Sequence, residues 1–198
     1  MAIRFYDQAV YDKINHWVKD PNMRVLKPDE TSRLFQMHAD LQDDKPLKLP
    51  LITLARDTSM EIISTTKKAL SYDSAHIAAN TGKSEILNAI PIKLSYQLDI
   101  YTKYFAEADE YIRNFIFNII NYPRISIEIP YNNVKIQHDS TMLLESTVSD
   151  NSDISERLIS GQFTRMSLRF TVDDAYLFSV PFMDNWNVEY SDKIKVEE

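Results

Sequence analysis

Few residues of this 198-residue chain stand at a spacing that could support chemistry. Thr81-Gly82-Lys83-Ser84 matches the end of the phosphate-binding loop G-x-x-x-x-G-K-[ST], in which backbone amides and a lysine surround phosphate groups. The first glycine of that motif would be residue 77, but the chain has Ile77 there. We therefore interpret this segment as a turn and predict no nucleotide binding.

Metal ligands are also not grouped in the sequence. None of the four histidines (His16, His38, His76 and His138) has a second histidine at the three- or four-residue spacing of a helical metal site. The segment from Asp150 to Asp153 is rich in oxygen ligands, but it lacks the glycine and the closing glutamate of a calcium loop. Convergence of histidines in the fold stays open, but the sequence predicts no metal and no cofactor.

Covalent catalysis has little support either. The two glycines, Gly82 and Gly161, are too far apart to form a G-x-S-x-G nucleophile elbow. Adjacent acids such as Asp109-Glu110 and Asp173-Asp174 point in different directions, so we interpret them as solvated charges and turn formers. The absence of cysteine excludes a thiol nucleophile. We predict that the protein is not an enzyme. A small hydrolase or ligand-binding domain, with residues that meet only in the fold, is the alternative of another class.

The overall composition indicates one globular domain, residues 1–198, with 44% hydrophobic residues. The formal net charge of −7 disfavours a nucleic-acid-binding surface, although an acidic pore would let DNA slide through. Charges interrupt the apolar residues of the N-terminus, so we predict neither a signal peptide nor a membrane anchor. Residues 20–48 are polar and could form an arm, and residues 191–198 are expected to fray.

The hydrophobic period changes within the segment from Pro91 to Tyr122. Alternating apolar residues from Ile92 to Ile100 are typical of a half-buried strand. From Phe105 to Ile119 the apolar residues recur every three or four positions, which predicts a long helix that ends before Pro123.

The same patterns predict the other elements. Residues 3–18 form an amphipathic helix, residues 31–40 could form a short helix, and residues 66–89 form a turn-rich connection. The strands are expected at 49–56, 124–130, 134–147 and 163–172, and residues 60–65 are expected to form a second strand or a continuation of the first. This order predicts an α+β fold: a mostly antiparallel twisted sheet with the long helix and the N-terminal helix packed on one face.

Several segments resemble the tail-completion proteins of contractile-tailed bacteriophages. The main one is P-I-K-x-x-Y-x-L-x-I-x-T-[KR]-Y, which begins at Pro91 and precedes an acidic amphipathic helix. The stretch from Leu49 to Leu54, the turn Ser71-Tyr72-Asp73 and the strand from Arg165 to Val172 are similar to further segments of that family, in the same order over roughly residues 48–182. Residues 57–68 have no counterpart, which leaves open which ring of the phage neck the chain would form.

The resemblance implies a structural virion protein that forms a homohexameric ring at the head-proximal end of the tail. Its partners would be the tail tube or sheath protein and the neck or connector proteins, with DNA only passing through the lumen. Such a protein would terminate and stabilise the tube and sheath by binding, without catalysis. A tail-tube terminator or another neck protein is the alternative within this class.

Candidate interface residues lie in two apolar segments. The end of the long helix is apolar on nearly every side, so it should be buried within the domain or against a neighbouring subunit. The C-terminal run is rich in aromatic residues, which are enriched at protein interfaces, although they could also pack in the core. The expected interface residues are Ile116, Phe117, Ile120, Phe182, Trp186 and Tyr190. We expect Tyr176 and Phe178 to belong to the core.

Overall fold

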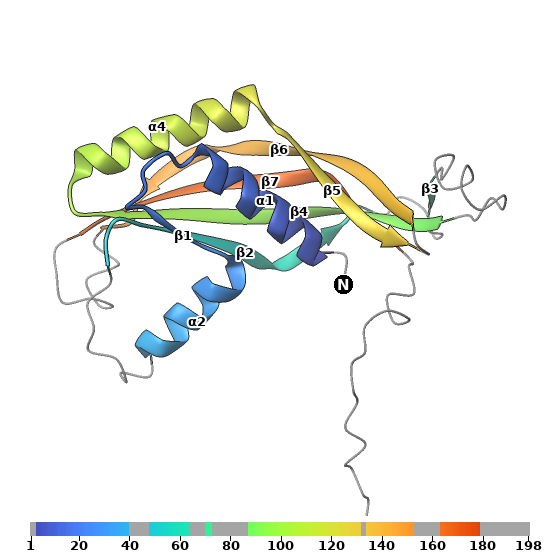
Figure 1. Ribbon diagram of the computed structural model, residues 1–198, viewed down its shortest axis with the longest axis horizontal. Helices are drawn as coiled ribbons and strands as arrows, with labels where there is room; N and C mark the ends of the chain where they lie inside the picture. Colours follow the sequence, from blue (N-terminus) through green and yellow to red (C-terminus); the bar gives the residue numbers. More distant parts are fainter. Residues whose placement is uncertain are drawn as a thin grey trace, which may run out of the picture.

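The computed structural model describes residues 3–39, 48–63, 70–72, 87–131, 134–152 and 163–178. Three helices and seven strands occur in these ranges, and Figure 1 shows their arrangement. In chain order they are α1 (Ile3–Trp17), β1 (Arg24–Leu26), α2 (Pro28–Ala39), β2 (Leu51–Ile62), β3 (Leu70–Tyr72), β4 (Leu87–Thr102), α4 (Phe105–Asn121), β5 (Arg124–Tyr131), β6 (Val134–Asp150) and β7 (Thr164–Phe178).

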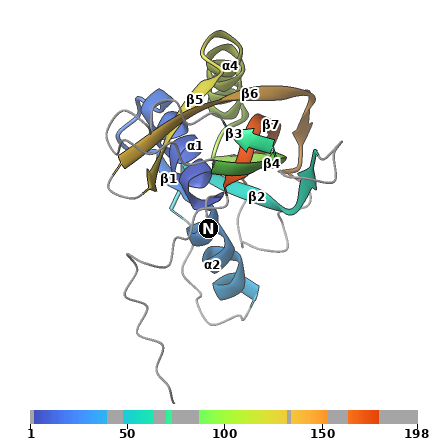
Figure 2. The same ribbon diagram turned by 90° about the vertical axis from the view of Figure 1, so that its right-hand side faces the viewer.

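The strands form one sheet in the order β1-β2-β4-β7-β6-β5, and β3 pairs with β4 outside this path. The β1–β2 pairing is parallel, and all other pairings are antiparallel. The sheet curls because the first part of β6 leaves β7: pairing of β6 with β7 starts only at Thr141, while residues 134–140 pair with β5 alone (Figure 2). The predicted α+β class with a mostly antiparallel sheet is confirmed.

In the middle of the two central strands, β4 and β7, the even-numbered residues face the core. The even-numbered residues of β4 from Ile92 to Ile100 are buried in the main hydrophobic cluster, together with Met166, Leu168, Phe170 and Val172 of β7. Tyr96 and Phe170 face each other across the two strands and stack with their ring centroids 5.5 Å apart. The alternation that the sequence predicts for both strands is thus confirmed.

Two helices contribute their apolar stripes to the same cluster. From α4 these are Ala108, Ile112, Phe115 and Ile119, and from α1 they are Tyr6, Val10, Ile14 and Trp17. Helix α1 ends one residue before its predicted end at residue 18, and α4 ends at Asn121, ahead of Pro123 as predicted, because helical spacing and the stops at Asp20-Pro21 and Pro123 are strong signals. In Figure 1, α4 lies along one side of the sheet and α2 projects from the opposite side.

A polar contact fixes α1 against the sheet. Asp7 of α1 accepts hydrogen bonds from Arg56 of β2 at 2.6 Å and from the Tyr96 hydroxyl of β4 at 2.9 Å. Burial raises the pKa of the Asp7 carboxyl, although the charge of Arg56 opposes this shift. The contact fixes the depth of α1 over β2 and β4.

Several elements differ from the sequence expectation. The β1 strand was not expected; it pairs with β2 from Leu51, and its Leu26 is buried. Helix α2 begins at Pro28 instead of residue 31, because proline suits the first helical position and the Glu30 carboxylate accepts a hydrogen bond from the Lys27 backbone N–H at 3.2 Å. These elements occupy much of the segment expected as an arm; residues 40–47 and 191–198 lie outside the described residues.

The connection expected at residues 66–89 also contains strand structure. β3 pairs with the start of β4, with Leu70 opposite Ala89, so Ser71 and Tyr72 lie in a strand and not in a turn. Ile62 and Ile92 pair across β2 and β4, which makes the expected strand at residues 60–65 a continuation of β2 after a register shift. Periodicity gave little signal here because β3 has only three residues.

Candidate interaction surface

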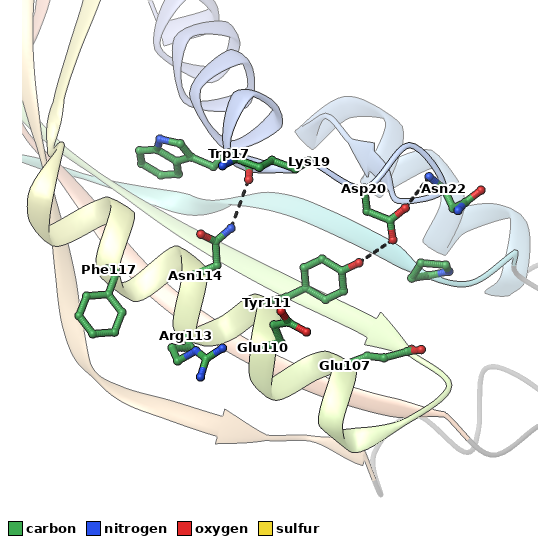
Figure 3. Close-up of a pocket in the computed structure, with 11 residues that line it drawn as sticks. Trp17, Lys19, Asp20, Asn22, Glu107, Glu110, Tyr111, Arg113, Asn114 and Phe117 are labelled. Atoms are coloured by element: carbon green, nitrogen blue, oxygen red, sulfur yellow. Dashed lines mark hydrogen bonds between the residues drawn. The ribbon is translucent and has the colours of Figure 1, made fainter.

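A wide groove lies between α4 and the loop that follows α1. Its volume is about 790 Å³, and its lining residues are Trp17, Lys19, Asp20, Asn22, Pro50, Glu107, Glu110, Tyr111, Arg113, Asn114 and Phe117. Tyr111 and Asn114 reach from α4 toward the loop (Figure 3). The Tyr111 hydroxyl donates to Asp20 at 2.8 Å, and the Asn114 amide donates to the Trp17 carbonyl at 3.2 Å. These two hydrogen bonds hold the sides of the groove together.

Asp20 is fixed as a carboxylate by its surroundings. It also accepts a hydrogen bond from the Asn22 backbone N–H at 2.8 Å, and this bond together with that from Tyr111 lowers the pKa of Asp20. Burial and the hydrogen bond to Asp20 raise the pKa of the Tyr111 hydroxyl. At neutral pH this part of the groove therefore holds a charged acid and a neutral phenol.

A second groove, which we call the basic groove, continues from the wide groove toward the end of α4. Its volume is about 540 Å³, and it is lined by Lys13, His16, Trp17, Lys19, Asn114, Asn118 and Tyr122. None of these lining residues is acidic, although the chain has a net charge of −7. The basic groove therefore combines positive charge with two aromatic side chains and two amides.

The basic residues of this groove are held in place by contacts along α1. The Lys13 ammonium donates to the Arg124 carbonyl and lies 5.5 Å from the centroid of the Trp17 ring. Burial lowers the pKa of Lys13. Asn118 donates to the side-chain oxygen of Asn114 at 2.7 Å, which orients both amides. In the sequence, Lys13, His16 and Lys19 recur every three residues, a spacing that indicates the basic side of the groove but not the α4 residues that complete it.

Two of the predicted interface residues lie on the solvent side of α4. Phe117 is 61% exposed and Ile120 is 62% exposed, and Tyr122, just beyond the helix, is 63% exposed. We call Phe117, Ile120 and Tyr122 the apolar patch. Ile116 is partly buried against the main core, and Ile119 is fully buried. The end of α4 is therefore not buried all round within the domain.

The other predicted interface residues, Phe182, Trp186 and Tyr190, lie outside the described residues, as does the segment Thr81–Ser84. Phe178 is buried in the core and Tyr176 packs against it, so the expectation for these two aromatic residues is confirmed. Both rings contact the imidazole of His138, with centroids 5.1 Å away for Tyr176 and 5.9 Å away for Phe178.

His138 is a packing histidine. It lies among aromatic rings, and its Nε2 donates to the carbonyl oxygen of Asp174 at 2.6 Å. Asp174 has a φ of 57° and sits where β7 bulges opposite β4. Burial lowers the pKa of His138. Among the described residues, no three His, Asp or Glu side chains are grouped as metal ligands.

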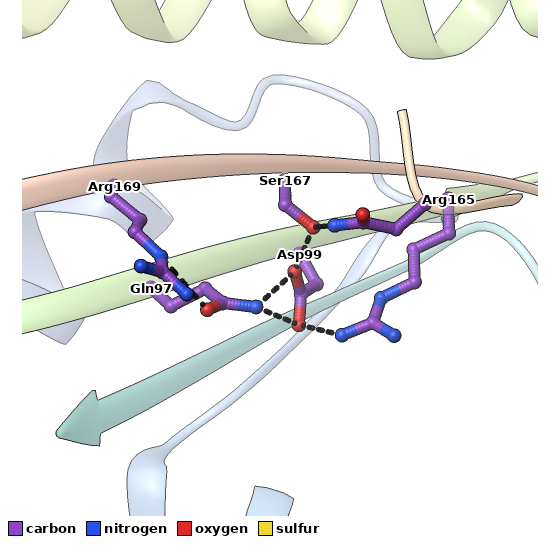
Figure 4. A network of polar contacts seen from close by, with 6 residues as sticks. Gln97, Asp99, Arg165, Ser167 and Arg169 are labelled. Carbon is purple, nitrogen blue, oxygen red and sulfur yellow. Dashed lines mark hydrogen bonds and ion pairs between the residues drawn. The ribbon is translucent and has the colours of Figure 1, made fainter. Parts of the chain in front are cut away.

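A polar network on the other face of the central strands is the second candidate (Figure 4). Asp99 of β4 accepts hydrogen bonds from Arg165 at 2.8 Å and from Ser167 at 2.5 Å, both on β7. Gln97 donates to both carboxylate oxygens of Asp99 at 2.9 and 3.1 Å. Burial alone would lower the pKa of Arg165, but the adjacent Asp99 charge raises it. With both of its oxygens occupied, Asp99 links β4 to β7.

Tyr101 borders this network. Its ring lies 5.6 Å from the Arg165 guanidinium, and burial together with the Asp99 charge raises its pKa to about 12. The phenol therefore stays neutral at physiological pH. Within the described part of the chain, its buried hydroxyl and the buried Thr53 hydroxyl have no hydrogen bond of normal geometry. We interpret the network as a structural link between strands.

Comparison with models of known protein families gave no match, and comparison with curated proteins gave none. No helix among the described residues is long and apolar enough to span a bilayer. The surface between α1 and α4, with the apolar patch beside it, is the candidate site that the geometry itself defines.

Proposed function

We propose that this chain is a structural virion protein that forms a homohexameric ring at the head-proximal end of a contractile phage tail. The ring terminates and stabilises the tail tube and sheath and provides the joining surface for the neck or connector proteins. It acts by binding, without a cofactor, and DNA only passes through its lumen. The order of the sequence segments that resemble tail-completion proteins supports this proposal.

The structural observation that carries the proposal is the apolar patch. α4 buries one stripe on the sheet, and on its opposite side it exposes Phe117 and Ile120 to about 60%. Large exposed apolar side chains that gather beside a groove are typical of protein interfaces. In a closed ring each subunit needs two different patches, one for each neighbour. The apolar patch supplies one of them.

The finer arrangement expected from the sequence also fits a ring subunit. We propose that α1 and α4 form one layer on the core face of the sheet, because their buried residues share one cluster with the even-numbered residues of β4. The opposite face presents polar side chains such as Gln97 and Arg169. A neighbour that approaches the helical layer would then meet the groove and the apolar patch together.

The alternatives differ in what the groove binds. As a tail-tube terminator or another neck protein, the chain would form a similar ring at a different position. As a small hydrolase or ligand-binding domain, it would bind a small molecule in the wide groove, where Asp20, Tyr111 and Arg113 supply polar groups. The mass of the native assembly separates these classes.

Native mass spectrometry of the purified chain tests the proposal. Six copies of 23.1 kDa give an assembly of about 139 kDa. Ile120→Asp should shift the distribution to the monomer, because it places a charge on the apolar patch. Ala106→Asp is the matched control, since residue 106 is exposed near the other end of α4. A protein that stays monomeric in solution and does not co-purify with phage tails contradicts the proposal.

A further inference from the structure

We propose that the C-terminal segment of one copy, residues 179–198, docks in the basic groove and against the apolar patch of a neighbouring copy. This inference rests on the ring proposed above and identifies the two complementary patches that close it. The occupant is thus a second copy of the same chain.

The groove side of this contact has a defined chemistry. Lys13, His16 and Lys19 supply positive charge, and Trp17 and Tyr122 supply aromatic surface. Asn114 and Asn118 offer amide groups. Phe117 and Ile120 extend the apolar surface along α4. Such a surface favours a segment that is acidic and carries aromatic side chains.

The C-terminal segment has this composition. It contains five acidic residues and two lysines, and between Phe182 and Tyr190 its only charges are those of Asp184 and Glu189. Its aromatic residues are Phe182, Trp186 and Tyr190, spaced four residues apart in the sequence. Every aromatic residue outside the described ranges lies in this segment. No other stretch outside those ranges could supply aromatic anchors.

The distance from the end of β7 to the basic groove favours docking of residues 179–198 on a neighbouring copy over docking on the same copy. The end of α4 lies level with Val172 on β7, because Met142 donates to the carbonyl of Pro123 and pairs with Val172. Phe178, the last residue of β7, lies six residues further along the strand, which is about 20 Å. Phe182 follows Phe178 by four residues, so even a fully extended chain places it at most about 14 Å from Phe178 in the direction of the end of α4.

Within one copy, Phe182 therefore stops short of the groove, whereas Trp186 and Tyr190 lie far enough along the chain to reach it, so docking of all three aromatic residues requires the groove of another copy. The groove extends from the end of α4 toward its start, and hence further from Phe178. A neighbour in a ring can present its groove at the place where the segment leaves β7. Such head-to-tail contacts close into a ring and give each copy one donor and one acceptor surface.

Site-directed cross-linking tests this inference directly, because the natural chain contains no cysteine. One variant carries Asn121→Cys at the end of α4, and a second, differently tagged variant carries Asn187→Cys beside Trp186. The two variants are co-expressed and treated with a short bismaleimide cross-linker. We expect a heterodimer that contains both tags. The matched control replaces Asn121→Cys by Ala106→Cys, on an exposed position of the same helix, and should give little heterodimer.

Substitutions in the contact sharpen the test. Trp186→Ala should reduce the heterodimer yield by about tenfold or more, as expected for an aromatic anchor. Lys19→Glu should reduce it by a smaller factor, and Glu189→Lys in the other copy should restore it. Lys103→Glu, two residues before the start of α4, serves as the charge control.

A single chain that carries both Asn121→Cys and Asn187→Cys distinguishes the two sources of the segment. Cross-linked dimers and larger species support docking between copies, whereas an internally linked monomer overturns it. Native mass spectra of the same samples separate the two proposals. A hexamer without the heterodimer cross-link overturns this inference and leaves the ring in place; the absence of both overturns both.

Discussion

Replacing Arg165 by leucine tests how the two central strands are held together on their polar face. The Asp99 side chain is 4% exposed, and its closest charged partner is the Arg165 guanidinium at 2.8 Å. With an effective dielectric constant of about 20, two unit charges at this distance attract by roughly 6 kcal/mol before desolvation is counted. Desolvation offsets much of that energy when the pair forms, but loss of one partner leaves the other charge buried. We expect Arg165→Leu to lower the free energy of unfolding by about 3–5 kcal/mol.

Arg169→Leu is the matched control on the same strand and face. Arg169 is exposed, and its side chain donates to the neutral Gln97 side chain at 3.2 Å, so its loss should cost less than about 1 kcal/mol. Urea unfolding followed by circular dichroism gives both values from midpoints and slopes. The double variant Asp99→Leu/Arg165→Leu should be more stable than Arg165→Leu alone, because it removes the unpaired carboxylate.

The reasoning fails if Arg165→Leu costs no more than Arg169→Leu. It also fails if the double variant is less stable than Arg165→Leu by the full cost of the Asp99 substitution, because the two side chains would then act independently.

Three further predictions concern single positions. Phe115→Ala should lower the free energy of unfolding by about 3–5 kcal/mol, because Phe115 is fully buried. Phe117→Ala, on the solvent side of the same helix, should change the free energy of unfolding of the monomer by about 0.5 kcal/mol or less. Equal effects of the two substitutions in urea unfolding would contradict the observed orientation of α4. Asp174→Gly should leave the free energy of unfolding nearly unchanged, whereas Asp174→Val should lower it by about 1–2 kcal/mol or more, because φ at this residue is 57° and β-branched residues disfavour that region. If calorimetry shows the valine variant to be more stable than the glycine variant, the bulge conformation is wrong. Burial lowers the pKa of His138 below its ordinary value of 6.5, so on acidification the unfolded chain binds this proton first and the free energy of unfolding falls as the pH drops below about 6.5. His138→Gln should reduce the difference in free energy of unfolding between pH 7.5 and pH 5.5. An unchanged difference would exclude His138 as the cause.

Much of the fold could be predicted where one period persists over many residues. The helices at Ile3–Trp17 and Phe105–Asn121 and the core faces of β4 and β7 follow directly from their apolar spacing. β1 and β3 could not be predicted, because three residues are too few to show a period. The start of α2 was missed because capping by Glu30 and Pro28 is a local signal that periodicity does not detect.

The candidate surface was only partly predictable. The apolar end of α4 was evident from Phe117 and Ile120, but their exposure depends on which side of the helix meets the sheet. The basic groove brings together Lys13 and Asn118, which are more than a hundred residues apart, so spacing alone could not show it. The link between Asp99 and Arg165 is also a product of strand pairing, since Asp99 and Ser167 lie opposite each other in the register.

Electron microscopy of purified tails that contain a tagged copy of this chain tests the central claim most directly. The account predicts a closed ring of six copies at the head-proximal end of the tail, beyond the last ring of tube and sheath. Tails that lack the chain, or that carry it at the opposite end, would contradict the account.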